Sequence, residues 1–394
     1  MSRTSSTSTI PKSARELKNQ LSGVHTPGRL LSLDVFRGIT VAAMILVNNP
    51  GDWGAIYPPL RHAEWHGATP TDLVFPFFLF IVGVSISFSL STRKYEEAGH
   101  TKLILKIFKR SLILFGLGLF LHLFPDFDFA TVRIPGVLQR IAIVFFICAI
   151  IFLKTSIRSQ IYFMAAILLS YWFLMALIPV PGIGFNSLEP GKNVAAWLDN
   201  LLLHGHMWQQ TNTWDPEGIL STLPAIATGI SGMLAGQWLR FDIDPARKIT
   251  WMFVAANLAI LAGLIWDWVF PINKALWTSS FVLYTTGLAL NFLAICYWMI
   301  DVQGFTRWTK PFVVYGVNAI TVFFLSGLIP RILSMIKVTG ADGSEVGLQA
   351  YVYNSVFTPL FSPVNASLAW ALSFVLVWLG VLWIMYNKRI IIKV

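Results

Sequence analysis

Residues 61–83 read RHAEWHGATPTDLVFPFFLFIVG. The first half of this stretch holds two histidines, a glutamate and an aspartate, and the second half opens an apolar run that continues to about residue 91. A helix needs about 20 apolar residues to cross the hydrocarbon core of a bilayer. The stretch therefore predicts a membrane-spanning helix over 71–91, with a polar block at its entrance.

The composition of the whole chain also favours a membrane protein. The 394 residues are 55% hydrophobic and 12% charged, with a mean hydropathy of +0.65, whereas soluble domains carry about 25% charged residues. Long apolar runs span a bilayer as helices, because lipid offers backbone polar groups no other partner. We predict an all-α integral membrane protein, a polytopic bundle of about ten transmembrane helices. The predicted spans are 31–48, 71–91, 104–124, 136–153, 160–178, 218–238, 249–270, 278–300, 311–333 and 365–386.

The chain is expected to consist of a tail and one membrane domain. Residues 1–28 are polar and rich in serine and threonine, which is typical of a cytoplasmic tail, and they lack the features of a cleaved signal peptide. Residues 29–394 form the predicted single transmembrane domain. Cys148 and Cys296 both fall in apolar spans, so a disulfide framework and a four-ligand zinc site are not expected.

The distribution of basic residues predicts the orientation. If both termini are cytoplasmic, 22 of the 29 basic residues lie on the inner side, in agreement with the positive-inside rule. By the same division, 12 of the 19 acidic residues lie outside. The net charge of +10 is thus explained by topology and by attraction to anionic membrane lipid. We expect a multi-pass protein of the cell's inner (cytoplasmic) membrane, and no nucleic-acid partner.

Asp72 and His62 are the first candidate catalytic pair. Thr69 or Thr71 can cap the span, with Pro70 in its first turn. Asp72 then lies at the positive end of the helix, where its anion is stabilised. A carboxylate held there can orient a nearby imidazole and stabilise its protonated form, as in nucleophile–base–orienter triads.

The two histidines leave three interpretations open. His62 and His66 have the spacing of metal ligands on a helix, but Gly67 and the Pro58-Pro59 pair argue against a regular helix, and we predict no metal. Both histidines could instead be hydrogen-bonded residues at the level of the lipid headgroups. The favoured interpretation is a catalytic base at the outer membrane face, because the unperturbed pKa of histidine lies near neutrality.

Other polar residues lie at the ends of the spans. Asp34 and Arg37 share a helix face, either as an interfacial anchor or as a cytoplasmic site for an anionic group. Arg140 lies about one turn into a span, so a partner such as Asp72, Glu217 or a bound anion is implied. Further polar groups at outer ends or within spans are Asp215, Glu217, Asn273, Lys274 and Asn318.

Several of these stretches together resemble one family. SLDVFRG (32–38), the block at 61–83, RIPGVLQRIAI (133–143), WDPEGILST (214–222), PINKALWTSSFVL (271–283) and GVNAI (316–320) are similar to heparan-α-glucosaminide N-acetyltransferase and its bacterial relatives. The similarity runs in order from about residue 29 to 325. It implies a transmembrane acetyltransferase that moves acetyl from cytoplasmic acetyl-CoA to an amino sugar on the far side of the membrane. The family also suggests a homodimer.

The resemblance also implies residue roles. The family motif H-A-x-W-x-G assigns the reactive histidine to His62, with Trp65 and Gly67 as companions. The family aspartate matches Asp72, and the asparagine that ends the first shared span matches Asn48. Asn48 is expected to hydrogen-bond either the thioester oxygen or His62. We therefore take His62, Asp72 and Asn48 as the catalytic residues.

The remaining candidates bind the two substrates. Arg37, Lys106, Lys109 and Arg110 are expected to hold the coenzyme phosphates at the inner surface. The predicted acceptor-sugar residues are Glu64, Trp65, His66, Arg140, Asp215, Glu217, Asn273, Lys274 and Asn318. Two alternatives remain open at this point: an O-acyltransferase of a glycan or lipid, and a proton-coupled transporter that uses the same polar groups as a relay.

Overall fold

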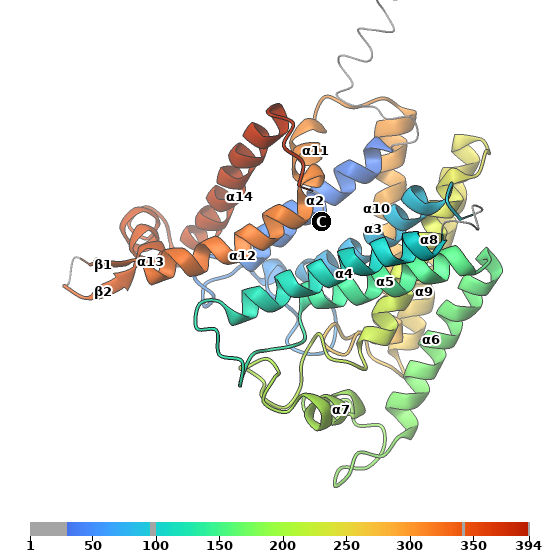
Figure 1. The fold of residues 1–394 in the computed structure, drawn as a ribbon, viewed down its shortest axis with the longest axis horizontal. Coiled ribbons are helices and arrows are strands. Elements are labelled where there is room, and N and C mark those ends of the chain that lie inside the picture. Colours follow the sequence, from blue (N-terminus) through green and yellow to red (C-terminus); the bar gives the residue numbers. More distant parts are fainter. Residues whose placement is uncertain (1–29, 95–99, 341–342, 393–394) are drawn as a thin grey trace, which may run out of the picture. The chain divides into compact units, whose positions relative to one another are not determined.

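The computed structural model describes residues 30–94, 100–340 and 343–392, and these are mostly helical (Figure 1). Leu31–Val394 form one compact unit. The helices are α2 (Leu31–Asn48), α3 (Pro70–Leu90), α4 (His100–Leu123), α5 (Val137–Lys154), α6 (Ile157–Leu177), α7 (Val194–Leu203), α8 (Thr222–Arg240), α9 (Pro245–Asp267), α10 (Ser279–Cys296), α11 (Lys310–Val317), α12 (Ala319–Met335), α13 (Leu348–Val352) and α14 (Pro363–Asn387). Short 3-10 or π turns occupy Pro58–Leu60, Tyr297–Val302 and Tyr353–Phe357, and a two-stranded antiparallel hairpin pairs β1 (Lys337–Thr339) with β2 (Glu345–Gly347).

Seven helices in the described ranges are long and apolar enough to cross a membrane, or eight if one bent pair counts as a single span. The protein is therefore a multi-pass membrane protein, as predicted, while the count of ten crossings stays a prediction. Helices also occupy the positions of the other predicted spans, but α4 carries Lys102, Lys106, Lys109 and Arg110 in its first half. Neither α4 nor α8 is among the seven helices. Helix α8 is built largely from small residues and is buried inside the bundle.

The predicted span 311–333 is not one continuous helix. The chain breaks at Asn318, and α11 and α12 meet there at 78°. Asn318 has φ −117° and ψ 37°, which is not helical. Its side-chain amide donates to the Ile390 carbonyl at 3.1 Å and accepts from the Ile392 backbone N–H at 3.0 Å. The break is thus held by the segment that follows α14.

Helix α3 lies at the centre of the bundle, packed against α2, α5, α8 and α10. Its contact with α8 is close because glycines replace side chains at the crossing. A Cβ atom on Gly83 would lie 2.0 Å from the Gly229 carbonyl oxygen, and one on Gly232 would lie 2.0 Å from the Phe80 carbonyl oxygen. Glycines allow such backbone approach between membrane helices. Helix α3, which carries Asp72 in its first turn, is therefore packed tightly in the core.

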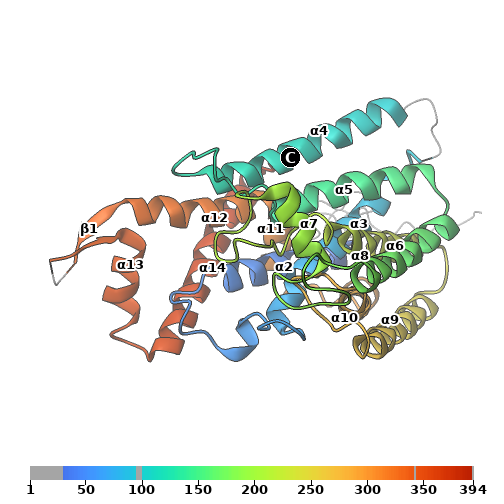
Figure 2. The ribbon, with the colours of Figure 1, turned by 90° about the horizontal axis from the view of Figure 1, so that it is seen from below.

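The two views place the hairpin and α13 at the side of the bundle away from α6 and α9 (Figures 1 and 2). The loops that precede α3, α5, α8 and α10 gather at one end of the bundle. Backbone hydrogen bonds join Gly67 to Ile272 at 2.7 Å and Ile134 to His206 at 2.9 Å. We call this end, which carries residues 61–69, 130–136, 205–221 and 268–278, the His62 end. Four of the segments predicted to lie outside the membrane are thus brought together.

Candidate active site

The loop before α3 delivers its polar side chains through a capped helix start. Thr69 is the N-cap of α3 and Pro70 follows in the first turn, as predicted. One carboxylate oxygen of Asp72, Oδ2, accepts the backbone N–H groups of Ala63 and Thr69, each at 3.0 Å. The Asp72 side chain is only 2% exposed. The carboxylate therefore stabilises both the helix start and the loop that carries His62.

The other carboxylate oxygen of Asp72 faces His62. The His62 Nδ1 to Asp72 Oδ1 distance is 2.6 Å. An ionised carboxylate is only an acceptor, so Nδ1 carries the proton in this arrangement and Nε2 retains its lone pair. The His62 side chain is 52% exposed, in contrast to the buried Asp72. The pair thus combines a fixed orienting acid with an accessible imidazole, which is the arrangement of a general base or nucleophile.

Lys274 completes this cluster from a distant part of the chain. Its Nζ lies 3.1 Å from His62 Nδ1, 3.4 Å from His62 Nε2 and 3.6 Å from Asp72 Oδ1. Burial lowers the pKa of the Lys274 ammonium, and the charges of Asp72 and Glu217 oppose that shift. The sequence prediction placed Lys274 with the acceptor-binding residues, and the structure puts it in direct contact with the imidazole.

Asn273 fastens the His62 loop to the turn that carries Lys274. Its side-chain amide donates to the Trp65 carbonyl at 2.8 Å, and its oxygen accepts the Leu276 N–H at 2.9 Å. Gly67 has φ +94°, a conformation that favours glycine, and its N–H bonds the Ile272 carbonyl. Asn273 was predicted to bind the acceptor, but it is fully buried with both ends of its amide used. It acts as a positioning residue.

The long loop between α6 and α8 covers one side of the cluster. The Trp65 indole donates to the Leu188 carbonyl at 2.8 Å, and its ring packs edge-on against Trp214, with 5.1 Å between centroids. Trp65 also packs against the apolar cluster that contains Val194 and Ala195 of α7. The loop is therefore anchored to the residue that the family motif pairs with His62.

His66 and Glu64 lie on the exposed side of the His62 loop. Residues 61–66 are not helical, so the four-residue spacing does not place His62 and His66 on one helix face. The contact of His66 Nδ1 with the Asn273 amide is long, at 3.5 Å. Within the described residues, no group of three or more His, Cys, Asp or Glu side chains forms a metal-binding cluster.

Asp215 and Glu217 form ion pairs that the sequence interpretation missed. Arg133 donates to Asp215 through Nε at 2.8 Å and through Nη2 at 2.6 Å, and Nη2 also contacts Glu217 at 2.5 Å. Burial acts to lower the Arg133 pKa, but the hydrogen bonds and charges of both acids outweigh it and raise that pKa. Asp215 also accepts the Trp208 N–H. These acids precede α8 and hold the loops of the His62 end together.

Arg140 is buried beside the same cluster. It is 1% exposed, and its Nη2 donates to Ser221 Oγ at 2.5 Å and to the Gly218 carbonyl at 3.3 Å. Its guanidinium carbon lies 5.1 Å from the centre of the Trp277 ring. Its Nε and Nη1 have no hydrogen-bond partner among the described residues. The expected carboxylate partner is thus replaced by a hydroxyl, a carbonyl and an aromatic face.

Asp199 of α7 is a buried acid that the sequence analysis did not identify as a candidate. It is 1% exposed and accepts the Ile219 backbone N–H at 2.9 Å. Burial raises the pKa of its carboxyl to about 6, although hydrogen bonding opposes the shift. The only sequence signal was its place in the long loop, which is too weak to identify a buried acid.

The predicted coenzyme residues lie elsewhere. Arg37 of α2 donates to Asp34 at 3.1 Å and to Ser85 of α3 at 2.7 Å. Ser85 follows Asp72 by 13 residues in the same helix, which corresponds to roughly 20 Å along its axis. Lys106, Lys109 and Arg110 are exposed on α4, which packs mainly against α5, and Arg110 lies over the Phe145 ring at 5.5 Å. Arg37 thus lies on α2, and the other three predicted phosphate ligands lie together on α4.

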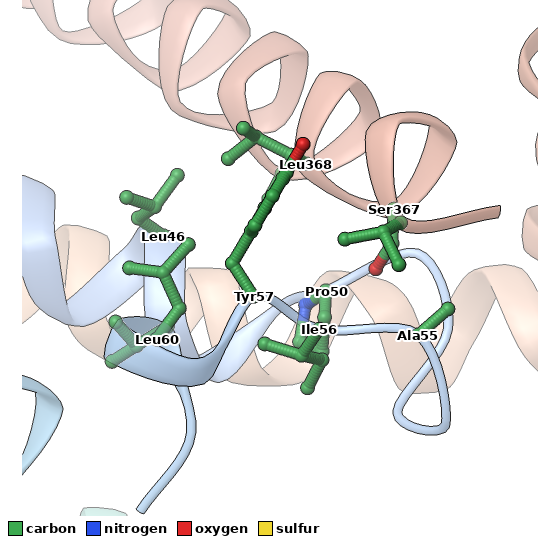
Figure 3. Close-up of a pocket in the computed structure, with 11 residues that line it drawn as sticks. Leu46, Pro50, Ala55, Ile56, Tyr57, Leu60, Ser367 and Leu368 are labelled. Atoms are coloured by element: carbon green, nitrogen blue, oxygen red, sulfur yellow. The ribbon is translucent and has the colours of Figure 1, made fainter. Parts of the chain in front are cut away.

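Asn48 and Asn318 are not part of the His62–Asp72–Lys274 cluster. Asn48 is exposed at the end of α2, and Asn318 holds the segment after α14. A small apolar pocket lies near Asn48, between the end of α2, the 50–60 segment and the start of α14 (Figure 3). Tyr57, one of its lining residues, donates to Asn365 at 2.5 Å. None of the predicted site residues lines this pocket.

Comparison of the sequence with known proteins places the chain in a family. Residues 29–264 match the family profile described as "Heparan-alpha-glucosaminide N-acetyltransferase, catalytic". The chain belongs to this family. It is 31% identical over 354 residues to heparan-alpha-glucosaminide N-acetyltransferase of Homo sapiens, covering 75% of this chain and 52% of the human protein. It is also 31% identical over 350 residues to the Mus musculus protein, covering 75% of this chain and 53% of the mouse protein.

The family match covers most of the site. It includes His62, Asp72 and Arg140, while Asn273 and Lys274 lie beyond its end at residue 264. The chain spans about half the length of the curated relatives it matches. The resemblance noted from the sequence motifs is therefore confirmed at the level of the family.

Proposed function

We propose that this protein transfers acetyl from acetyl-CoA to the amino group of a glucosamine-type sugar, with His62 as the base. The observation that carries the proposal is the 2.6 Å contact between His62 Nδ1 and the buried Asp72. It leaves a lone pair on Nε2 of an exposed imidazole to accept a proton, and Lys274 Nζ lies 3.4 Å from this atom. Membership of an N-acetyltransferase family supplies the reaction class and the type of acceptor.

In the proposed reaction, Nε2 of His62 takes a proton from the sugar ammonium. The free amine attacks the thioester carbonyl and the new C–N bond forms. The nitrogen then loses its second proton to water, and the C–S bond breaks to release coenzyme A as a thiolate. The imidazolium that forms remains paired with Asp72 and returns its proton to the departing thiolate. Asp72 stabilises this charged intermediate without moving, because the backbone N–H groups of Ala63 and Thr69 hold its other oxygen.

We further propose that the two substrates approach from opposite sides of the membrane. Acetyl-CoA is charged, so its phosphates would stay near the basic cytoplasmic surface while its slim pantetheine arm enters the bundle. Arg37 is the best placed of the predicted phosphate ligands, because it contacts α3 roughly 20 Å along the helix from Asp72. Thioester and amine would meet at the His62 end.

Direct transfer is favoured over a covalent route. An acetyl-imidazole on His62 would face an exposed side, where water competes for the acetyl group. Holding both substrates in a near-attack arrangement lowers the barrier by itself. The direct route requires both substrates to be bound together, so double-reciprocal plots should intersect.

The test uses purified protein, labelled acetyl-CoA and a panel of amino sugars and hydroxyl acceptors. Transfer to an amino sugar is expected, and acetyl-CoA alone should give no rapid release of one coenzyme A per subunit. A burst of one coenzyme A per subunit, with acetyl recovered on His62, would replace direct transfer by the covalent route. Transfer to hydroxyl groups alone would make the protein an O-acyltransferase, and no transfer to any acceptor would contradict the proposed reaction.

A further inference from the structure

Among the residues that the structure describes, Lys274 is the one cation that contacts both His62 and Asp72 through a hydrogen bond or an ion pair. Its Nζ lies within 3.6 Å of three acceptor or ring atoms of the pair. The side chain is 23% exposed, so part of it reaches the surface of the site. A cation at this place, 212 residues away in sequence from its imidazole contact, needs a chemical explanation.

The distance from Lys274 to Nε2 relates the cation to the reacting atoms. A group that gives its proton to His62 must lie within about 3 Å of Nε2. The carbonyl that this amine attacks is adjacent to it, and its oxygen gains negative charge as the C–N bond forms. Because Lys274 Nζ is only 3.4 Å from Nε2, it lies within reach of that oxygen.

We infer that Lys274 is the oxyanion-stabilising residue of the acetyl transfer, donating from its ammonium to the oxygen of the tetrahedral intermediate. This inference rests on the proposed function and adds a group that acts on the transition state rather than on sugar binding. Preorganised donors of this kind are usually the largest single contribution to catalysis of acyl transfer. The proton stays on Lys274 throughout, and the charge on the oxygen collapses when the C–S bond breaks.

Two other donors are less suited to this position. Asn48 was expected to hydrogen-bond either the thioester oxygen or His62, but no hydrogen bond joins it to His62 or Asp72, all three of which the structure describes. Arg140 retains unpartnered N–H groups, yet these are fully enclosed and the Trp277 ring lies against its guanidinium. Arg140 therefore acts at a distance, through its charge on Lys274.

The surroundings also keep the ammonium in place. Asn273 holds the turn that carries Lys274, and its amide is fixed by two backbone contacts. Burial and the charge of Arg140 lower the pKa of Lys274, while Asp72 and Glu217 raise it, and the net shift is downward. Protonated Lys274 is the active form, so activity should fall as pH rises through a value below the ordinary lysine pKa.

The experiment compares Lys274→Met and Lys274→Arg with a matched surface control, Lys192→Met. Lys192 is exposed and paired only with Glu189 among the contacts of the structure. Steady-state kinetics with acetyl-CoA and glucosamine should show kcat reduced about 10²- to 10³-fold in Lys274→Met. The KM for each substrate and the binding of acetyl-CoA should change less than about threefold, and Lys192→Met should match the wild type.

Lys274→Arg provides the readout that a structural role would not give. Its kcat should be at least about tenfold higher than that of Lys274→Met. The alkaline limb of its pH–activity profile should move to higher pH, because arginine stays protonated. An unchanged kcat in Lys274→Met with a raised sugar KM would overturn the inference and make Lys274 a binding residue. Equal loss in both variants, with the pH profile unmoved, would also overturn it.

Slow hydrolysis of acetyl-CoA without any sugar separates this inference from the proposed acceptor. Hydrolysis passes through the same tetrahedral oxyanion, with water in place of the amine. If the wild type hydrolyses acetyl-CoA and Lys274→Met does so about 10²-fold more slowly, the oxyanion role is supported even where no amino sugar is acetylated. Equal hydrolysis rates would overturn the role, whichever acceptor is used.

Discussion

Replacing Asp72 by asparagine tests the orienting acid without removing the helix cap. Oδ2 of Asp72 accepts two backbone N–H groups. The asparagine oxygen must take that place, because its amide nitrogen cannot accept them. The amide N–H₂ then faces His62 Nδ1 at the position now occupied by Oδ1. It donates to Nδ1 and forces the proton onto Nε2, so that the imidazole cannot act as a base.

The size of the effect follows from the contact that is lost. A hydrogen bond to a charged group contributes about 1.5–3 kcal/mol, which corresponds to a loss of roughly 10- to 150-fold in kcat. Trapping the wrong tautomer adds to this loss. The same change in a Ser-His-Asp triad lowers kcat by about 10⁴-fold. We therefore expect Asp72→Asn to lower kcat by about 10²- to 10⁴-fold.

The assay is acetyl transfer from labelled acetyl-CoA, measured together with the thermal unfolding midpoint in detergent. The midpoint should stay close to the wild type because the cap is retained, and Glu189→Gln, at an exposed surface pair, should behave as wild type in both measurements. Turnover of Asp72→Asn within about threefold of wild type, with an unchanged midpoint, would remove the pair from the mechanism.

Three further predictions concern single residues. His62→Ala should abolish transfer while acetyl-CoA binding, measured by calorimetry, stays within a few-fold, and near-normal turnover would exclude the proposed base. Arg37→Ala should raise the KM for acetyl-CoA several-fold by removing a charge-assisted contact, with Lys192→Ala as control, and an unchanged KM would mean that the phosphates bind elsewhere. Asp199→Asn should stabilise the protein at pH 8 by up to about 3 kcal/mol: the buried carboxyl has its pKa raised to about 6, so ionisation destabilises the wild type as pH rises from about 4 through 6. If the unfolding midpoint changes by the same amount between pH 4 and pH 8 in the wild type and in Asp199→Asn, the raised pKa of Asp199 would be contradicted.

Local sequence was enough to predict the class of fold and the contact between His62 and Asp72. Apolar runs long enough for a bilayer can only be helices in lipid, so the helical positions followed directly from hydropathy. His62 and Asp72 are ten residues apart, and the capping pattern of Thr69, Pro70 and Asp72 already placed the acid at a helix start. Such short-range relations depend on backbone geometry that the neighbouring residues dictate.

Hydropathy was a weaker guide where helices face protein instead of lipid. Helix α8 is formed from small and polar residues because its partners, not the bilayer, cover it. The break at Asn318 is stabilised by the backbone of residues 390 and 392, more than 70 residues further along the chain. No local pattern around Asn318 indicates those contacts.

The rest of the site was decided by tertiary structure alone. Whether Lys274 touched the sugar or the imidazole depended on how the turn after α9 meets the His62 loop, and that meeting is made by Asn273 and Gly67. Arg133, rather than Arg140, pairs with Asp215 and Glu217 because the loop before α5 lies against the loop before α8. Sequence specifies which charged groups exist near a helix end, but their pairing is set by side chains that arrive from distant segments, since only the packed bundle fixes the distances on which electrostatic interactions depend.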